Sequence, residues 1–251
     1  MNVLLLSPHP DDIAWSIGGT VARLAGTGTA LSALTLFGRT TYAPASPAHG
    51  TTAAGGVRAL EDAAWSSLTG VRLYRADLPD ASLRGYDDDT EMGARAEPAI
   101  VAQAAERLAG ALRATRPDLL LVPLAIRGHV DHVAARAAAE AVAPVEAPGC
   151  ALVYYEDLPY AAGVHVSHTD HPVVVGVAAH HAEREAGVRC YPSQEPHLIL
   201  PVISAHSATA GGERLWAATG SGAHCFSQLL AGVPAMPNTD APLPRMETHA
   251  W

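Results

Sequence analysis

The chain has 251 residues, 49% of them hydrophobic, and a formal net charge of −9 at neutral pH. A chain of this length can bury a full core as one α/β domain, and its composition is that of a soluble globular protein. Nucleic acids and anionic membrane surfaces select clustered Lys and Arg, which are lacking here, so a small-molecule partner fits better.

Strands and helices are predicted to alternate along the chain, because short apolar runs alternate with longer segments of helical periodicity. The expected order is strand 2–7, helix 15–25, strand 29–37, helix 57–68, strand 71–74, helix 99–115, strand 118–122, helix 133–143, strand 151–155, strand 171–175 and helix 178–189. This alternation is typical of a Rossmann-like α/β fold, a mostly parallel sheet with helices on both faces. We expect one domain over residues 1–251, with an irregular, proline-rich tail at about 231–251.

Two polar clusters each follow an apolar run that is predicted to be a strand. The first is Ser7-Pro8-His9-Pro10-Asp11-Asp12, after residues 3–6, and the second is His129-Val130-Asp131-His132, after residues 119–123. In α/β sheets ligands bind beyond the carboxyl ends of strands, so the two clusters are expected to converge. The ligands of zinc are of these residue types, and a catalytic zinc takes three of them. The sequence therefore predicts a metal site.

A structural interpretation of the same residues remains open. Asp11 or Asp12, after Pro10, could simply cap the helix that begins near residue 13. Each histidine taken singly could be a surface or core residue.

The chain resembles the PIG-L/LmbE family of zinc-dependent N-deacetylases, whose signatures are a histidine-Pro-Asp-Asp segment after the first strand and a later His-x-Asp-His segment. The resemblance runs along most of the chain. Beyond the two clusters it includes Gly18-Gly19-Thr20, the pair Arg58 and Glu61, the stretch Leu78-Pro79-Asp80 to Leu83-Arg84, and Tyr191-Pro192-Ser193-Gln194. The chain departs from the family pattern at Ile13, where the family usually has glutamate, and at Arg127.

The resemblance implies roles for six residues of the two clusters. His9, Asp12 and His132 would bind Zn²⁺, with Fe²⁺ or another divalent metal as the alternative. Asp11 would be the general base, and protonated His129 would stabilise the oxyanion. Asp131 would accept a proton from one of the flanking histidines and fix its tautomer.

Three further residues are expected to bind substrate: Arg58, Asp80 and Arg127. Arg58 could instead form an exposed ion pair with Glu61, and Asp80 could be a turn former. Arg127, two positions before His129, is expected to face the pocket and bind an anionic or strongly polar part of the substrate, with an exposed surface arginine as the alternative. Loops 38–56 and 87–91 are expected to wall that pocket.

The resulting hypothesis is removal of an N-acetyl group from an amino sugar or amino-sugar conjugate. One alternative is an amidase that cleaves a larger N-acyl or thiol-conjugate amide, and another is a non-catalytic carbohydrate-binding protein with a retained metal site. We expect a cytoplasmic protein with free thiols, no secretion signal and no membrane span, and homo-oligomerisation is left open. A second metal site at His165, His168 and His171 is not expected, because this stretch is loop-like.

Overall fold

The computed structural model describes residues 1–87, 90–166 and 171–232, and within them seven strands form one sheet in the order β3-β2-β1-β4-β5-β7-β6. The strands are β1 (Asn2–Ser7), β2 (Ala30–Thr35), β3 (Arg72–Arg75), β4 (Leu119–Pro123), β5 (Ala151–Tyr155), β6 (His171–Val175) and β7 (Glu213–Ala217). Strands β1 to β5 pair in parallel, whereas β7 is antiparallel to both β5 and β6. The sheet is therefore mostly parallel, as predicted.

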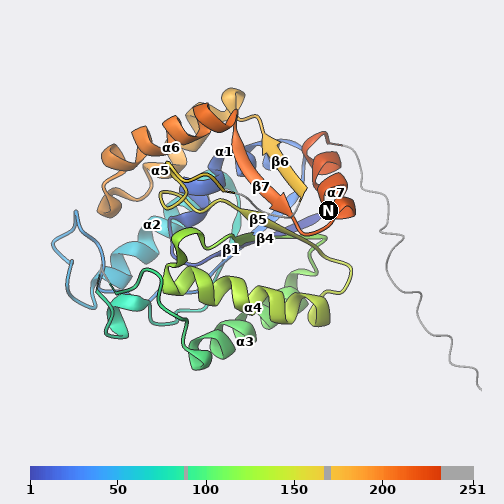
Figure 1. Ribbon diagram of the computed structural model, residues 1–251. Helices are drawn as coiled ribbons and strands as arrows, with labels where there is room; N and C mark the ends of the chain where they lie inside the picture. Colours follow the sequence, from blue (N-terminus) through green and yellow to red (C-terminus); the bar gives the residue numbers. More distant parts are fainter. Residues whose placement is uncertain (88–89, 167–170, 233–251) are drawn as a thin grey trace, which may run out of the picture.

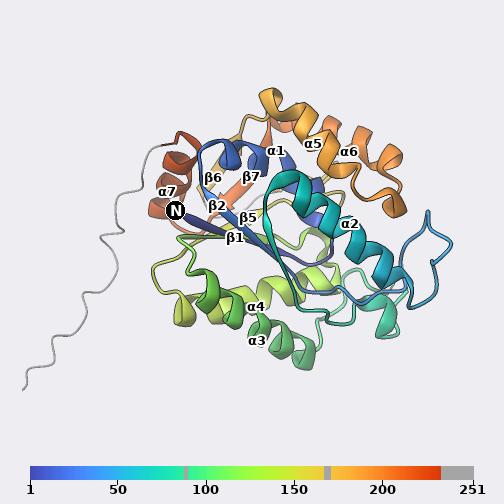
Figure 2. The same ribbon diagram turned by 180° about the vertical axis from the view of Figure 1, so that it is seen from behind.

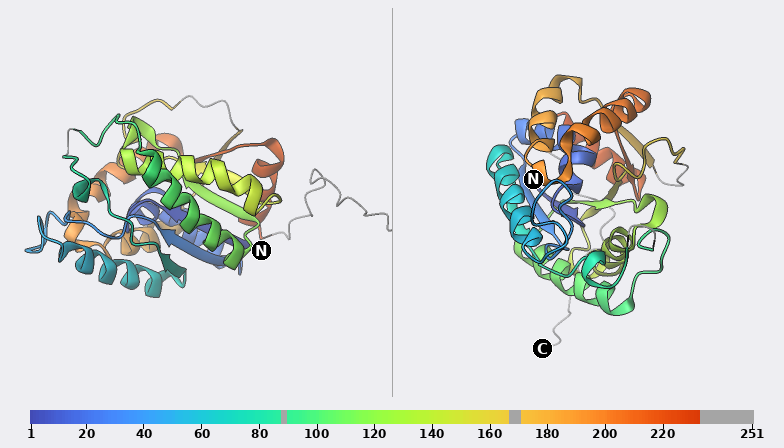
Figure 3. Two further views of the ribbon diagram at one scale, coloured as in Figure 1. Left: turned by 90° about the horizontal axis from the view of Figure 1, so that it is seen from below. Right: turned by 90° about the vertical axis from the view of Figure 1, so that its left-hand side faces the viewer.

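Helices cover both faces of this sheet (Figures 1 and 2). They are α1 (Asp12–Gly26), α2 (Ala54–Thr69), α3 (Pro98–Thr115), α4 (Val130–Glu146), α5 (His181–Val188), α6 (Pro196–Ala210) and α7 (Gly220–Leu230). Side chains of β1 alternate between the two cores: Val3 and Leu5 pack with α1, α2, α5, α6 and α7, and Leu4 and Leu6 pack with α3 and α4. Seen from below, the green helices α3 and α4 lie across the sheet (Figure 3, left).

The strand order reverses between β1 and β4. The chain runs from β1 outward to β2 and β3, then returns to the other side of β1 for β4 and β5. Ligand sites of open α/β sheets lie at such a reversal, beyond the carboxyl ends of the strands. Here these ends lead into the segments that carry His9 and His129, so the fold brings the two clusters together.

Every strand predicted up to residue 175 is present. Each helix predicted before residue 175 begins earlier in the structure than predicted. Helices α1 and α4 begin at Asp12 and Val130, so each starts inside a polar cluster. Segment 178–189 begins as a 3₁₀ turn and continues as α5. The prediction missed α6, β7 and α7. Helix α6 contains Pro201 and α7 begins with Gly-Ser-Gly, residues that weaken the helical signal. Of the predicted tail only residues 231 and 232 fall within the described part of the chain.

The cysteines at 150, 190 and 225 are free thiols, as expected. In the described ranges, no helix combines the length and hydrophobicity needed to cross a bilayer.

Helix α1 is kinked, and a buried carboxylate closes the kink. Ile17 leaves the helical conformation, with φ −138° and ψ 27°. The carboxylate of Glu213, on β7, accepts the N–H groups of Gly19 and Thr20 at 2.9 and 2.7 Å and lies 3.1 Å from Arg184 Nε. A Cβ at Gly19 would lie 2.6 Å from Val177 Cβ, so close packing requires glycine there. These contacts fix the helix that begins at Asp12.

Replacement of Glu213 should therefore destabilise the fold. Glu213→Ala removes the carboxylate that pairs with the buried Arg184 guanidinium and accepts two N–H groups of α1, and should lower the free energy of unfolding by about 3 to 5 kcal/mol. Urea denaturation measures this quantity. Glu183→Ala is the control, because the Glu183 side chain is 58% exposed, and it should change stability by less than about 0.5 kcal/mol. Equal stability of the two variants would show that Glu213 does not support the kink.

Candidate metal centre and active site

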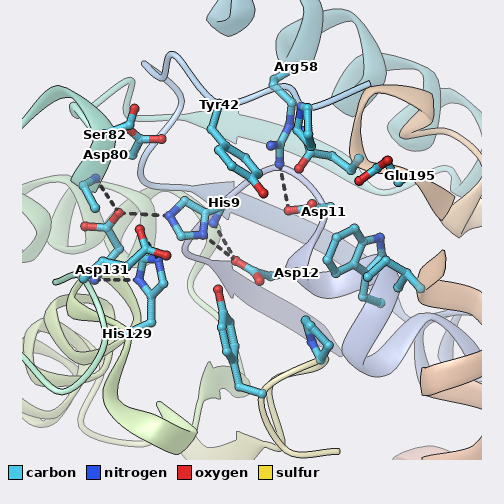
Figure 4. A pocket seen from close by; sticks show the side chains of 18 of the residues that line it. His9, Asp11, Asp12, Tyr42, Arg58, Asp80, Ser82, His129, Asp131 and Glu195 are labelled. Atoms are coloured by element: carbon cyan, nitrogen blue, oxygen red, sulfur yellow. Dashed lines mark hydrogen bonds and ion pairs between the residues drawn. The ribbon is translucent and has the colours of Figure 1, made fainter. Parts of the chain in front are cut away.

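Three predicted metal ligands, His9, Asp12 and His132, converge at the edge of the sheet. Figure 4 shows His9 and Asp12 side by side in the pocket. His9 follows β1, Asp12 begins α1 and His132 lies in the first turn of α4. Potential ligand atoms of the three lie within 4.8 Å of one another. The two carboxylate oxygens of Asp12 face the two rings: Oδ2 lies 3.3 Å from His9 Nδ1, and Oδ1 lies 3.4 Å from His132 Nε2. This mixed set of two imidazoles and one carboxylate suits a divalent transition metal.

His132 has one ring nitrogen occupied and the other without a partner. Its Nδ1 lies 2.8 Å from Asp157 Oδ2, and Asp157 Oδ1 accepts the N–H of Ile126 at 3.2 Å. Nε2 is buried and has no hydrogen-bond partner among the described residues. A histidine whose second nitrogen is held by a carboxylate is the usual arrangement of a metal ligand. The residues present therefore fit a metal, and Asp157 is a candidate site residue that the sequence analysis missed.

Asp131 holds His9, not one of the histidines beside it in the sequence. Its Oδ2 lies 2.9 Å from His9 Nε2 and accepts the N–H of Ala81 at 3.0 Å, while Oδ1 lies 2.7 Å from Arg84 Nη1. Burial alone would raise the pKa of Asp131, but His9 and Arg84 lower that pKa to about 2. The prediction that Asp131 bonds to a flanking histidine was wrong. Its carboxylate bonds instead to His9, in the segment that follows β1. The contact leaves His9 Nδ1 facing Asp12.

A second group of possible ligands, His9, His129 and Asp131, also lies within 4.8 Å. It is the poorer site, because both oxygens of Asp131 are already engaged by His9, Ala81 and Arg84.

His129 is the N-cap of α4. Its Nδ1 accepts the N–H of Asp131 at 3.1 Å, and its Nε2 lies 3.4 Å from Glu91 Oε2. Burial lowers the pKa of His129, the contact with Glu91 raises it, and the neighbouring His132 and His9 lower it further. Because Nδ1 accepts a backbone N–H, Nε2 is the ring nitrogen that carries a proton.

Asp11 and Asp12 are adjacent, but their carboxylates have different surroundings. Asp11 occupies the N-cap position of α1 without a side-chain capping bond, and its Oδ1 lies 2.8 Å from Arg58 Nη2. Burial raises the pKa of Asp11 to about 6, even though Arg58 lowers it. Burial would also raise the pKa of Asp12, but His132 and His9 hold it well below its usual value. The structural interpretation, in which the Asp11 side chain caps the helix, therefore does not explain its position.

Arg58 and Glu61 are both buried, so the alternative of an exposed ion pair is wrong. Arg58 Nε lies 3.9 Å from Glu61 Oε2, and Glu61 instead accepts the backbone N–H and the hydroxyl of Ser193, each at 2.7 Å.

A cavity of about 270 Å³ opens beside the cluster and is lined by His9, Asp11, Asp12, Arg58 and His129. As predicted, loops 38–56 and 87–91 wall it, through Tyr42 and Pro44 and through Asp87 and Glu91. Asp80 also lines the cavity, and its Oδ1 accepts the hydroxyl of Ser82 at 2.6 Å.

Arg127 does not line this cavity. Its side chain is exposed and reaches the carbonyl of Ala162, with Nη2 at 3.5 Å. Ala125 and Arg127 both have left-handed backbone conformations, with φ 59° and 63°, in the turn between β4 and α4. The expectation that Arg127 faces the pocket was wrong, and the argument for an anionic substrate is lost with it.

The histidine run contributes no metal site in the part of the chain that is described. His165 is exposed, His171 lies on β6, and neither belongs to a group of possible ligands. His168 lies outside the described residues.

Comparison with known proteins identifies relatives of this chain. The sequence model of the PIG-L family, described as GlcNAc-PI de-N-acetylase, matches residues 4–143. A 2′-N-acetylparomamine deacetylase of Streptomyces fradiae is 39% identical over 165 residues, which are 64% of this chain and 58% of that protein. The matched region thus spans less than two thirds of this relative.

Solved structures share the fold. A deacetylase of the teicoplanin biosynthesis pathway has a TM-score of 0.72 and 23% identity, over 86% of this chain and 97% of the other. A 4-carboxy-2-hydroxymuconate hydratase of Pseudomonas putida has a TM-score of 0.63 and 18% identity, over 87% and 96%. The fold alone therefore does not fix the reaction. The family match covers more than half of the chain, and the chain belongs to the PIG-L family.

Proposed function

We propose that the protein is a zinc-dependent N-deacetylase that removes an N-acetyl group from an amino sugar or amino-sugar conjugate. The observation that carries this proposal is the buried, unpartnered Nε2 of His132, which faces Asp12 and His9. Membership of the PIG-L family and the deacetylase activity named for the Streptomyces fradiae relative support the reaction type.

His9, Asp12 and His132 would hold the zinc ion. Three protein ligands leave a coordination position open, as in catalytic zinc sites. A zinc ion bound there would polarise the amide carbonyl and lower the pKa of a bound water from 15.7 to about 7. Asp157 and Asp131 would keep the two histidines in the tautomers that the ligand role requires.

Asp11 would act as the general base. Its pKa of about 6 leaves it a carboxylate at neutral pH, yet close enough to that pH to accept a proton from the attacking water. Arg58, 2.8 Å away, holds the carboxylate in place. The protonated Asp11 would then return the proton to the departing amine nitrogen. A base of this kind typically contributes a factor of about 10² to 10⁴ in rate.

His129 would donate its Nε2 proton to the oxygen that becomes negative during the attack. A neutral imidazole can serve, because it still offers one N–H donor. The bond from the backbone of Asp131 to His129 Nδ1 keeps the proton on Nε2.

The lining of the cavity supports a sugar-containing substrate. Asp80 presents a carboxylate that can accept hydroxyl groups, while Tyr42, Tyr86 and Tyr160 supply aromatic surface. An amidase for a larger acyl group remains the rival within hydrolases. The raised pKa of Asp11 favours catalysis over a purely carbohydrate-binding role.

Metal content tests the assignment of ligands. His132→Ala and His9→Ala should each lose bound zinc, because each removes one of three protein ligands. Asp157→Ala should keep a weaker site, with zinc affinity reduced about 10- to 100-fold. Elemental analysis and chelator competition measure content and affinity. His165→Ala is the control, since His165 is exposed and outside the cluster. Wild-type zinc content in both ligand variants would contradict the site.

Asp11→Asn separates catalysis from metal binding. The variant should retain zinc but lower kcat/KM by about 10²-fold or more, since it removes the base at nearly constant size. Amine release from 2′-N-acetylparomamine and from N-acetylglucosamine conjugates is the readout. Asp77→Asn, whose carboxylate is 55% exposed, should behave as wild type. If Asp11→Asn loses its zinc, Asp11 is a ligand and the roles of Asp11 and Asp12 are exchanged.

A further inference from the structure

A chain of polar side chains runs from the proposed base to a wall of the cavity that the chemistry does not use. Arg58, which holds Asp11, has its Nε 3.9 Å from Glu61 Oε2. Both oxygens of Glu61 accept bonds from Ser193 at 2.7 Å, one from the backbone N–H and one from the hydroxyl. The amide nitrogen of Gln194, Nε2, donates to the Ser193 hydroxyl oxygen at 3.1 Å. Gln194 lines the cavity, so the chain ends where a substrate would lie.

The carboxylate of Glu61 sets the direction of the hydrogen bonds in this chain. A carboxylate only accepts, so the single proton of the Ser193 hydroxyl is committed to Glu61 Oε2. The Ser193 oxygen can then only accept from Gln194. A reversed amide would place the carbonyl oxygen of Gln194 against an oxygen that has no proton left to donate. The NH₂ group of Gln194 is therefore fixed toward Ser193, and its carbonyl oxygen, Oε1, is the end of the amide that is left for a ligand.

The backbone holds this amide in place. The carbonyl of Ser193 accepts the N–H of Ala45, from the loop 38–56, at 3.0 Å, and the N–H of Gln194 donates to the carbonyl of Tyr191 at 3.0 Å. Figure 4 shows the next residue, Glu195, on the side of the cavity where Arg58 meets Asp11. The acceptor is thus held in one position before a ligand arrives, which lowers the entropic cost of binding.

Gln194 Oε1 is an acceptor without a partner. The residue is only 5% exposed, and within the described part of the chain Oε1 makes no hydrogen bond. Oε1 is also not one of the fully buried unpartnered atoms, so it keeps access to the cavity that Gln194 lines. A glutamine that served only as support would be bonded at both ends of its amide. The free end indicates a ligand that donates a hydrogen bond.

We propose that Gln194 is a specificity-determining residue whose carbonyl oxygen accepts a hydrogen bond from one hydroxyl group of the amino sugar. This inference rests on the proposed deacetylase function and adds a substrate contact to it. A hydroxyl matches a neutral acceptor, because neither group brings a charge that must be compensated. A substrate without that hydroxyl would leave Oε1 unpaired in a largely buried place. Sites built around such a hydrogen bond reject analogues that lack the donor.

Deoxygenated substrates test the proposal. The parent is an N-acetylglucosamine conjugate that wild type turns over, and each analogue lacks one of the free hydroxyl groups of its amino sugar. Wild type should show a kcat/KM roughly 5- to 50-fold lower for one of these analogues, the range expected for an acceptor left unpaired. The loss should lie mainly in KM. The deoxyfluoro analogue at the same position should be equally poor, because fluorine accepts a hydrogen bond but has no proton to donate.

Gln194→Met removes the acceptor at nearly constant size. It should retain zinc and turn over the parent and the critical analogue with kcat/KM values within about twofold of each other. Ser193→Ala frees the Gln194 amide to turn and should reduce the preference for the hydroxyl by about two- to fivefold. Gln103→Met is the matched control, because Gln103 is exposed on α3 and lies outside the cavity, and it should keep the wild-type preference.

The outcomes separate this inference from the function on which it rests. Equal kcat/KM for the parent and every deoxy analogue in wild type overturns hydroxyl recognition and leaves the deacetylase function standing. A structural role for Gln194 would lower kcat/KM for all substrates by one factor, so a preference that survives in Gln194→Met overturns its role in specificity. A deoxyfluoro analogue as good as the parent overturns the direction of the amide. Absence of turnover on every N-acetyl amino sugar by zinc-loaded protein overturns the deacetylase function, and this inference with it.

Discussion

The hydrogen bond between His132 Nδ1 and Asp157 Oδ2 is the contact on which the site depends most. It joins α4 to the segment after β5, and it leaves His132 Nε2 facing Asp12. In the same way Asp131, from α4, bonds to His9 Nε2 and leaves His9 Nδ1 facing Asp12. Each of the two proposed histidine ligands is thus oriented by a carboxylate that follows a different strand. Such cross-links require β1, β4 and β5 to lie side by side, which is what the reversal of strand order provides.

Adjacent carboxylates acquire different properties from these surroundings. Burial penalises the charge of both Asp11 and Asp12, but only Asp12 lies between two imidazoles. Asp12 is therefore held as an anion suited to a metal, whereas the pKa of Asp11 rises to about 6, a value suited to a base. Two like residues with pKa values pushed apart by their environments are a recurrent mark of acid-base chemistry.

The sequence predicted the sheet and the ligand cluster because both depend on local patterns. Apolar runs followed by polar clusters located the ends of β1 and β4. Parallel pairing of these strands places both ends at the same edge of the sheet. Asp157 follows β5 in the same way and could have been found by the same rule. The partner of Asp131 and the position of Arg127 could not, because they depend on side-chain direction in a turn with left-handed residues. Helix α6 was missed because it is apolar on several sides and contains Pro201, which obscures helical periodicity.

Anomalous diffraction from crystals of zinc-loaded protein, recorded on both sides of the zinc absorption edge, tests the proposed centre most directly. One peak is expected, coordinated by His9 Nδ1, Asp12 and His132 Nε2, with Asp157 still bonded to His132 Nδ1. A peak coordinated by His9, His129 and Asp131 instead, or none in this cavity, would contradict the proposed centre.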